Sequence, residues 1–231
     1  NECIDYIVRG EPELVIKEIC SKISAFGGRQ GQPAFAGMTD AKTATPRTDA
    51  EHSAIRGATY RNGGRIVYGE NRETIKDLDL LPFPAWDLID TGKYILPFSG
   101  RKFLLLTPTR GCQFNCSFCI AHVYYGHKLR HHSAAYICTQ MESITKKLGV
   151  RDFLFWSSTF TADRNYTAEL CREIIKRKLG VKWVCNSRVD TVDAELLALM
   201  KEAGCRLVSF GIESLEENIL NKCGKHITVR Q

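Results

Sequence analysis

From residue 103 onward, strand patterns and helix patterns alternate along the chain. Strands are expected at 103–107, 152–156, 181–186 and 206–211, and helices at 135–148, 166–179 and 193–203. Gly180 and Gly204 stand where helices commonly end. Strand–helix alternation favours parallel pairing through right-handed crossovers. The expected fold class is therefore α/β, and such folds place their sites at the carboxyl ends of the strands.

Three cysteines follow the first of these strands with the spacing Cys-x3-Cys-x2-Cys. They are Cys112, Cys116 and Cys119, and the turn-forming run 108–111 precedes them. Three thiolates this close in sequence can bind three irons of a cubane cluster and leave the fourth iron open for a ligand. The alternative is a zinc site, but zinc needs four ligands and no second cysteine pair follows. His122 and His127 would have to complete it, so we expect the cluster.

The stretch 109–119 resembles the cluster loop of the radical S-adenosylmethionine (SAM) enzymes. In that family the open iron of a [4Fe–4S] cluster binds the amino and carboxylate groups of SAM. One electron from the cluster then splits SAM into methionine and a 5′-deoxyadenosyl radical. The resemblance therefore implies a [4Fe–4S] cluster and SAM as cofactors, and an electron donor such as flavodoxin or ferredoxin as a partner.

The same resemblance suggests side chains that contact SAM. Phe118 would lie against the adenine, or it simply packs the loop. Ser157 and Ser158 end the second strand, where cobalamin-type relatives carry an acidic pair that helps to hold the amino group of SAM. Hydroxyls carry no charge, so this departure weakens the expected binding of SAM. Asp163 could substitute, although a helix N-terminal role is the stronger interpretation.

Two further candidates follow the third and fourth strands. Arg188 would reach towards SAM, where a guanidinium can clamp a carboxylate; a salt bridge to Asp190 or Glu213 is the alternative. Glu213 lies in a Gly-Ile-Glu-Ser motif similar to the one whose glutamate accepts hydrogen bonds from the ribose hydroxyls of SAM. The histidines of the segment 122–132 are assigned no ligand role and are expected in an exposed loop.

The upstream part of the chain resembles the end of the Rossmann-like cobalamin-binding domain that precedes some radical SAM cores. The resemblance rests on a strand at 3–8, a helix opened by Pro12, an Asn-Gly hairpin near residue 62 and a short helix near 72–80. It also includes a linker with two prolines at 81–90. Cobalamin is implied by this resemblance only.

These features predict two domains. Residues 1–90 would be the C-terminal remnant of the cobalamin-binding domain, with a disordered insertion at about 24–53 and the linker at 81–90. Residues 91–231 would be the N-terminal part of a radical SAM core, a partial (β/α) barrel that is incomplete at its C-terminal end. The first residue, Asn1, also suggests a fragment or a processed chain.

Composition limits the remaining function classes. The net charge of +6 is mild and its basic residues are mostly scattered, so nucleic-acid binding is not expected. No apolar run is long enough for a membrane span. The chain has ten cysteines, and those outside the motif are dispersed, as in a reducing cytoplasm.

The expected function is a radical SAM enzyme that cleaves SAM reductively and methylates an unactivated carbon with cobalamin. The substrate would be a small or lipid-like molecule. Two alternatives remain open at this point. One is a catalytically inactive, truncated radical SAM-like protein; the other is a metal-binding structural module without catalysis.

Overall fold

The computed structural model describes residues 4–25, 55–62, 65–97 and 99–231. The described chain forms two compact units, Asn1–Ile75 and Lys76–Gln231, which we treat separately. The expected insertion at 24–53 lies almost entirely outside the described residues. The expected domain boundary after residue 90 remains a prediction, and the division into compact units falls earlier, after Ile75.

The first unit is a small antiparallel sheet with one helix. Its strands are β1 (Tyr6–Val8), β2 (Ala58–Asn62) and β3 (Arg65–Tyr68), in the order β1-β2-β3, and its helix is α1 (Pro12–Ala25). The β2–β3 pairing confirms the predicted hairpin. Val15 and Ile19 of α1 pack with Ile55 and Ala58 in a small apolar core.

The expected helix at 72–80 is wrong. Residues 72–77 are not helical, and only a single 3-10 turn forms at Leu78–Leu80. The backbone N–H of Ile75 donates instead to the Glu11 carboxylate at 2.6 Å. A donor that bonds a distant side chain is not available to a helical ladder, so this contact favours extended backbone.

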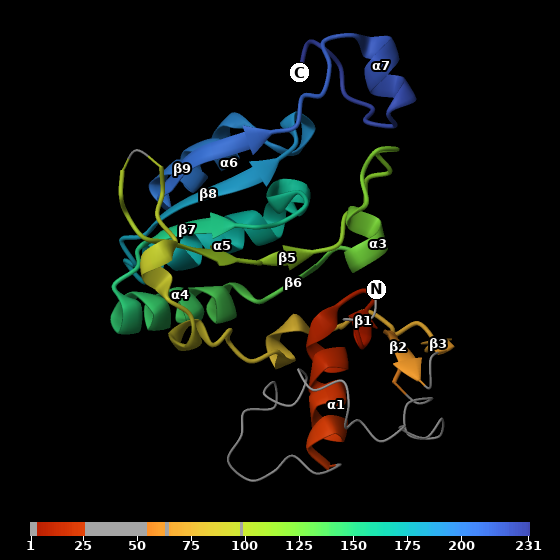
Figure 1. Ribbon diagram of the computed structural model, residues 1–231. Coiled ribbons are helices and arrows are strands. Elements are labelled where there is room, and N and C mark those ends of the chain that lie inside the picture. Colours follow the sequence, from red (N-terminus) through yellow and green to blue (C-terminus); the bar gives the residue numbers. More distant parts are fainter. Residues whose placement is uncertain (1–3, 26–54, 63–64, 98) are drawn as a thin grey trace. The chain divides into compact units, whose positions relative to one another are not determined.

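The second unit contains a four-stranded parallel sheet in the order β4-β7-β8-β9 (Figure 1). These strands are β4 (Phe103–Leu106), β7 (Asp152–Phe155), β8 (Lys182–Ser187) and β9 (Cys205–Phe210), joined by α4 (Ala134–Leu148), α5 (Arg164–Lys176) and α6 (Ala194–Glu202). The predicted bounds agree to within three residues. Each new strand is added on the same side of the previous one. Right-handed crossovers therefore place all three helices on one face of the sheet, as in a barrel wall.

An aromatic group lies at the centre of this unit. The rings of Phe155 and Trp183 stack at 4.7 Å between centroids, and Phe160 meets the Trp183 ring edge-on at 5.4 Å. Trp183 is 1% exposed, and its indole N–H donates to the carbonyl oxygen of Ala203 at 2.9 Å. The core thus fixes β7 and β8 against the chain that leaves α6.

The helices begin at side-chain caps. Ser133, Asp163 and Asp193 each accept a hydrogen bond from a backbone N–H in the first turn of α4, α5 and α6 respectively. Gly149 ends α4 in the left-handed conformation. These local signals explain why the sequence predicted the elements closely.

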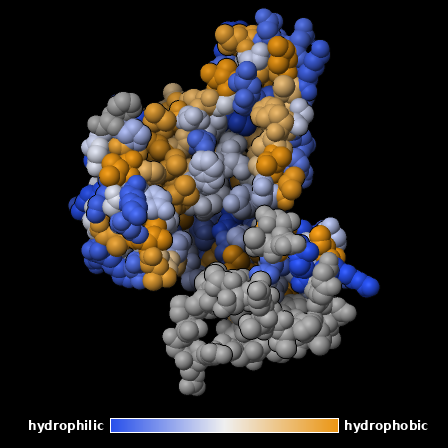
Figure 2. All heavy atoms as spheres, in the orientation of Figure 1, coloured by the Kyte–Doolittle hydropathy of each residue, from blue (hydrophilic) through white to orange (hydrophobic). Residues whose placement is uncertain are grey.

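The second unit also contains two short strands and two short helices. A two-stranded antiparallel ribbon is formed by β5 (Thr109–Arg110) and β6 (Arg130–His131), and α3 (Ala121–Tyr125) lies between these strands in the sequence. Helix α7 (Glu217–Lys222) follows β9. In Figure 2, apolar side chains gather over α7 and α3. Ile219 on α7, Leu215 just before it and Val123 on α3 are all exposed.

The sheet is open among the described residues. Strand β9 is an outer strand, and its Leu207 is 57% exposed. The described part of the second unit is therefore an open, parallel α/β sheet, as expected for a partial barrel. No helix in the described ranges has the length and apolar character that a bilayer crossing requires.

Candidate functional site

The three cysteines lie on a loop that the β5–β6 ribbon holds at its base. The N–H of Cys112 donates to the carbonyl oxygen of Gly126 at 3.2 Å, which ties the start of the loop to the end of α3. Gly111, immediately before, has φ +91°, and a side chain there would collide with the carbonyl oxygen of Lys128. Glycine is therefore required at the position where the ribbon opens into the loop.

Two of the three sulfurs have a hydrogen-bond donor directed at them. The N–H of Ala121 lies 3.4 Å from Sγ of Cys119, and Nη1 of Arg188 lies 3.7 Å from Sγ of Cys116. Cys112 is 8% exposed and Cys116 and Cys119 are half-buried; all three thiols are free. Donors of this kind stabilise thiolates, so the donor set fits an iron–sulfur cluster.

The described residues contain no group of three or more His, Cys, Asp or Glu side chains arranged to bind one metal ion. A zinc site requires such convergence on one point. In a cubane cluster each cysteine binds a different iron, so its sulfurs surround the cluster. His122 and His127 stack on each other at 5.0 Å between ring centroids. This geometry gives no support to the zinc alternative.

Arg188 follows β8 and is buried beneath the cluster loop. Its Nε and Nη2 donate to the two carboxylate oxygens of Asp190 at 2.9 and 2.7 Å. The structure thus shows the salt bridge that the sequence left as the alternative to a SAM contact. The guanidinium also lies 3.9 Å from the ring centroid of Phe114, on the cluster loop. Contact between Arg188 and SAM remains a prediction.

Glu213 follows β9 and pairs with a lysine that the sequence analysis did not single out. The ammonium of Lys225 lies 2.9 Å from Oε1 of Glu213, and Lys225 is 5% exposed. Glu213 has φ +65°, an uncommon backbone conformation for a residue with a side chain. A side chain at Gly211 would lie 2.8 Å from this ammonium. No spacing rule in the sequence indicated Lys225, because its role depends on the turn after α7.

That turn contacts the cluster loop directly. The N–H of Ser117 donates to the carbonyl oxygen of Cys223 at 2.9 Å. Gly224 packs so closely that a side chain would lie 2.7 Å from the carbonyl oxygen of Asn115. The segment 223–225 therefore supports the loop from the side where Glu213 is held.

The other predicted residues have distinct surroundings. Ser157 is buried, and its Oγ accepts a hydrogen bond from the N–H of Thr109 at 3.3 Å, whereas Ser158 is exposed. Asp163 accepts from the N–H of Tyr166 at 3.0 Å, which confirms its N-cap role. Phe118 is 54% exposed, so it does not pack the loop interior. Its contact with adenine remains a prediction.

His132 corrects the expectation of exposed loop histidines. It is 6% exposed, its ring stacks on Tyr136 at 4.1 Å, and its Nδ1 lies 3.1 Å from Oδ1 of Asp79. Burial lowers the pKa of His132, although Asp79 opposes this shift. Burial alone would raise the pKa of Asp79, but hydrogen bonds from Ser133 and His132 outweigh it and the pKa is lowered. This pair is structural and lies outside the cysteine loop.

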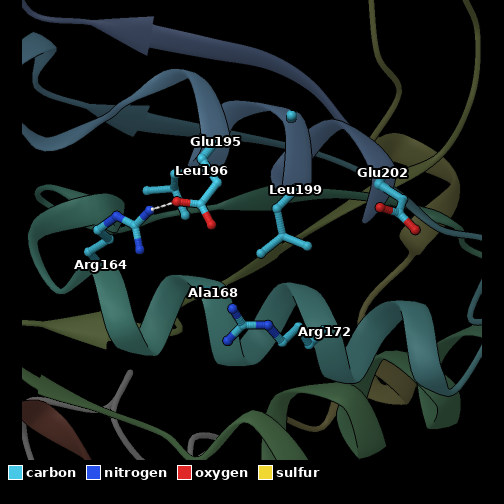
Figure 3. Close-up of a pocket in the computed structure, with 8 residues that line it drawn as sticks. Arg164, Ala168, Arg172, Glu195, Leu196, Leu199 and Glu202 are labelled. Carbon is cyan, nitrogen blue, oxygen red and sulfur yellow. Dashed lines mark hydrogen bonds and ion pairs between the residues drawn. The ribbon is translucent and has the colours of Figure 1, made fainter.

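Two of the hollows among the described residues of the second unit are relevant to the site. One, of about 240 Å³, is lined by side chains of α5 and α6 alone, among them Arg164, Arg172 and Glu202 (Figure 3). The other, of about 510 Å³, borders the cluster loop at Gln113 and is lined mainly by polar side chains such as Asn165. Of these two, only the second is lined by a residue of the cluster loop.

The fold and the site together define the class of protein. The fold is a parallel α/β sheet, and the site is a three-cysteine loop beyond the ends of its strands. Residues 106–231 match the family model described as "Radical SAM superfamily", which is more than half of the chain. The chain belongs to the radical SAM superfamily, whose enzymes use a [4Fe–4S] cluster and SAM. The expectation of both cofactors is thereby confirmed, while the individual residues that bind them remain predictions.

Two curated relatives align with nearly the whole chain. The chain is 31% identical to an uncharacterized methyltransferase of Pyrococcus horikoshii over 99% of its own length and 44% of the relative. It is 29% identical to the anaerobic magnesium-protoporphyrin IX monomethyl ester cyclase of Rubrivivax gelatinosus, over 99% of this chain and 38% of that one. The chain thus spans about two fifths of the length of these relatives.

Solved structures show the same fold. The radical SAM methyltransferase TsrM from Kitasatospora setae, solved with cobalamin and a [4Fe–4S] cluster, aligns with a TM-score of 0.67 and 17% identity, over 98% of this chain and 43% of that chain. The cobalamin-dependent SAM radical enzyme OxsB, solved with aqua-cobalamin and SAM, aligns with a TM-score of 0.71 and 18% identity, over 97% and 30%. The predicted fold class is confirmed.

Proposed function

We propose that the protein is a cobalamin-dependent radical SAM methyltransferase and that Cys112, Cys116 and Cys119 bind its [4Fe–4S] cluster. One observation carries the proposal. The loop with all three thiols is braced by Arg188 and by the turn that holds Glu213. Thiolates and a carboxylate suited to ribose hydroxyls therefore lie at the same end of the sheet.

The side chains of the site have separable tasks. The thiolates hold the cluster, and Lys225 fixes Glu213 through Oε1, so ribose hydroxyls would bind the carboxylate at its other oxygen. Ser157 links the end of β7 to the base of the loop through the N–H of Thr109. When bound, the cluster supplies the electron that cleaves SAM, and cobalamin supplies the methyl group that is transferred.

Methylation is supported by the names of several relatives. They include a cytidylyl-2-hydroxyethylphosphonate methyltransferase of Streptomyces wedmorensis and a hopanoid C-2 methylase of Rhodopseudomonas palustris, 30% and 24% identical over 63% and 64% of this chain. We propose a small or lipid-like substrate, an electron donor such as flavodoxin or ferredoxin, and a cytoplasmic location.

The test is anaerobic reconstitution of the chain with iron and sulfide, followed by electron paramagnetic resonance (EPR) with and without SAM. We expect a cluster signal that shifts on addition of SAM. Alanine at Cys112, Cys116 or Cys119 should abolish it, whereas alanine at the exposed Cys20 should not. Stoichiometric zinc without iron would contradict the proposal.

Cyclisation is a second candidate, favoured by the match to the cyclase over 99% of this chain. Labelled SAM separates the two reactions. Transfer of the labelled methyl group to a product supports methylation, and cleavage of SAM to 5′-deoxyadenosine without label transfer supports cyclisation.

A catalytically silent protein is favoured by Ser157, which is buried and already hydrogen-bonded at a position where the family resemblance implies a carboxylate. In that case the cluster forms but its EPR signal does not respond to SAM.

A further inference from the structure

The guanidinium of Arg188 connects three parts of the site. It is 5% exposed, and its Nη2 donates both to Asp190 and to the carbonyl oxygen of Lys225, each at 2.7 Å. Its Nη1 faces the sulfur of Cys116 at 3.7 Å. The planar group also stacks on Phe114, within the cysteine loop. Burial and these contacts together fix the position of the guanidinium.

We propose that Arg188 is a positioning residue for the cluster, which braces the loop and raises the cluster's reduction potential through the sulfur of Cys116. This inference rests on the proposed function, because it takes Cys116 as a cluster ligand. Reduction adds negative charge to a cluster. A cationic donor at a ligand sulfur stabilises that charge, so hydrogen bonds to the sulfurs raise the potential.

The arrangement of the donors argues against a SAM clamp. A carboxylate is bound most strongly by two parallel N–H groups of one guanidinium edge. In Arg188 the edge formed by Nε and Nη2 is occupied by Asp190 at 2.9 and 2.7 Å. Nη1 points to the sulfur instead, so the side that faces the loop serves the cluster ligand.

Asp190 does not cancel this effect. Its carboxylate binds the edge away from Nη1, and its side chain is 20% exposed, so solvent screens its charge more than that of the guanidinium, whose side chain is 6% exposed. In this ion pair it is therefore the cationic N–H of Arg188 that faces the sulfur of Cys116.

The experiment compares Arg188→Gln and Arg188→Lys with the wild type and with Arg101→Gln in the reconstituted chain. Arg101 is a matched control because its Nε and Nη2 also donate to the two oxygens of one carboxylate, that of Asp152, at the first residue of β7. The cluster is titrated with a reductant under EPR, without SAM, after its iron content has been measured. Addition of SAM then follows as a second readout.

For Arg188→Gln we expect the ratio of reduced to oxidised cluster at a fixed potential to fall about tenfold, a decrease of about 59 mV for a one-electron couple. Arg188→Lys keeps the charge but loses the stacked, directed donor, and should show a smaller decrease. Arg101→Gln should match the wild type. The signal of Arg188→Gln should still shift with SAM.

An unchanged potential in a loaded Arg188→Gln variant would overturn the inference. If the response to SAM were lost as well, Arg188 would be a SAM clamp. If the Gln variant holds no cluster, the Lys variant decides: a lowered potential supports the inference and an unchanged one refutes it. A wild type that forms no cluster refutes the proposed function itself, which is a separate outcome.

Discussion

The ammonium of Lys225 lies 2.9 Å from Oε1 of Glu213, in a contact where the lysine side chain is 5% exposed and the glutamate 38%. The backbone carbonyl of the same lysine accepts a hydrogen bond from Arg188. Lys225 therefore contacts both Glu213, the carboxylate expected to bind ribose, and Arg188, the arginine beneath the cluster loop. We therefore expect a substitution of the Lys225 side chain to weaken SAM binding more than it affects incorporation of the cluster.

Replacing Lys225 by methionine tests this link. Methionine fills similar space but leaves Glu213 without its cationic partner, so the carboxylate loses its fixed position. We expect SAM to bind about tenfold more weakly, which corresponds to about 1.4 kcal/mol. Calorimetric titration of the reconstituted chain measures this. Lys222→Met, at an exposed lysine on α7, is the control and should bind SAM normally. Equal binding in both variants would show that Glu213 needs no partner.

Replacing Gly111 by alanine should impair cluster incorporation. The added methyl group would collide with the carbonyl oxygen of Lys128 at a residue with φ +91°. Strain of this kind costs about 1–3 kcal/mol and would displace the start of the cysteine loop. The measurement is iron bound per chain after reconstitution. Gly100→Ala is the control, since Gly100 has φ +63° with open space around it. Similar iron content in both variants would contradict the role given to Gly111.

Two tryptophans, one buried and one exposed, allow their contributions to the free energy of unfolding to be compared. Trp183 is 1% exposed and stacked on Phe155, whereas Trp156 is 52% exposed. Trp183→Ala removes a buried ring and leaves a cavity, at a cost of about 3–5 kcal/mol in the free energy of unfolding. Trp156→Ala should cost less than about 1 kcal/mol. Urea unfolding followed by circular dichroism measures both. Equal losses would show that the aromatic group does not hold the sheet.

Acid should destabilise the second unit through His132. Burial lowers its folded pKa below the ordinary value of 6.5, while Asp79 and Asp77 oppose the shift and Arg110 adds to it. The unfolded state therefore binds more protons just below pH 6.5, and stability falls as the pH decreases through that range. Asp79 has a pKa below its ordinary 3.8, so its contribution is lost only in stronger acid.

The measurement is the free energy of unfolding between pH 7.5 and about 5. His132→Gln should flatten this dependence, because the buried imidazole is gone. His226→Asn, at an exposed histidine with φ 51°, should keep the wild-type slope. A slope unchanged in His132→Gln would assign the acid sensitivity to other groups.

Local sequence signals predicted most of the regular structure. The prediction used periodic apolar positions and the helix stops at Gly180 and Gly204, which act over a few residues. The structure adds the caps Ser133 and Asp193, which are equally local, so helix and strand bounds follow from nearby chemistry. One exception was the helix expected at 72–80. There the N–H of Ile75 is taken by Glu11, which lies 64 residues away in sequence.

The cysteine spacing and the strand–helix alternation were determined by the sequence alone, because both are patterns of neighbouring residues. The partners of Arg188 were not: Cys116 is separated from it by 72 residues and Lys225 by 37. The burial of His132 and Lys225 likewise depends on which segments pack together. Hydrogen bonding and desolvation act on neighbours in space, so only the tertiary structure decided which charged groups support the cluster loop.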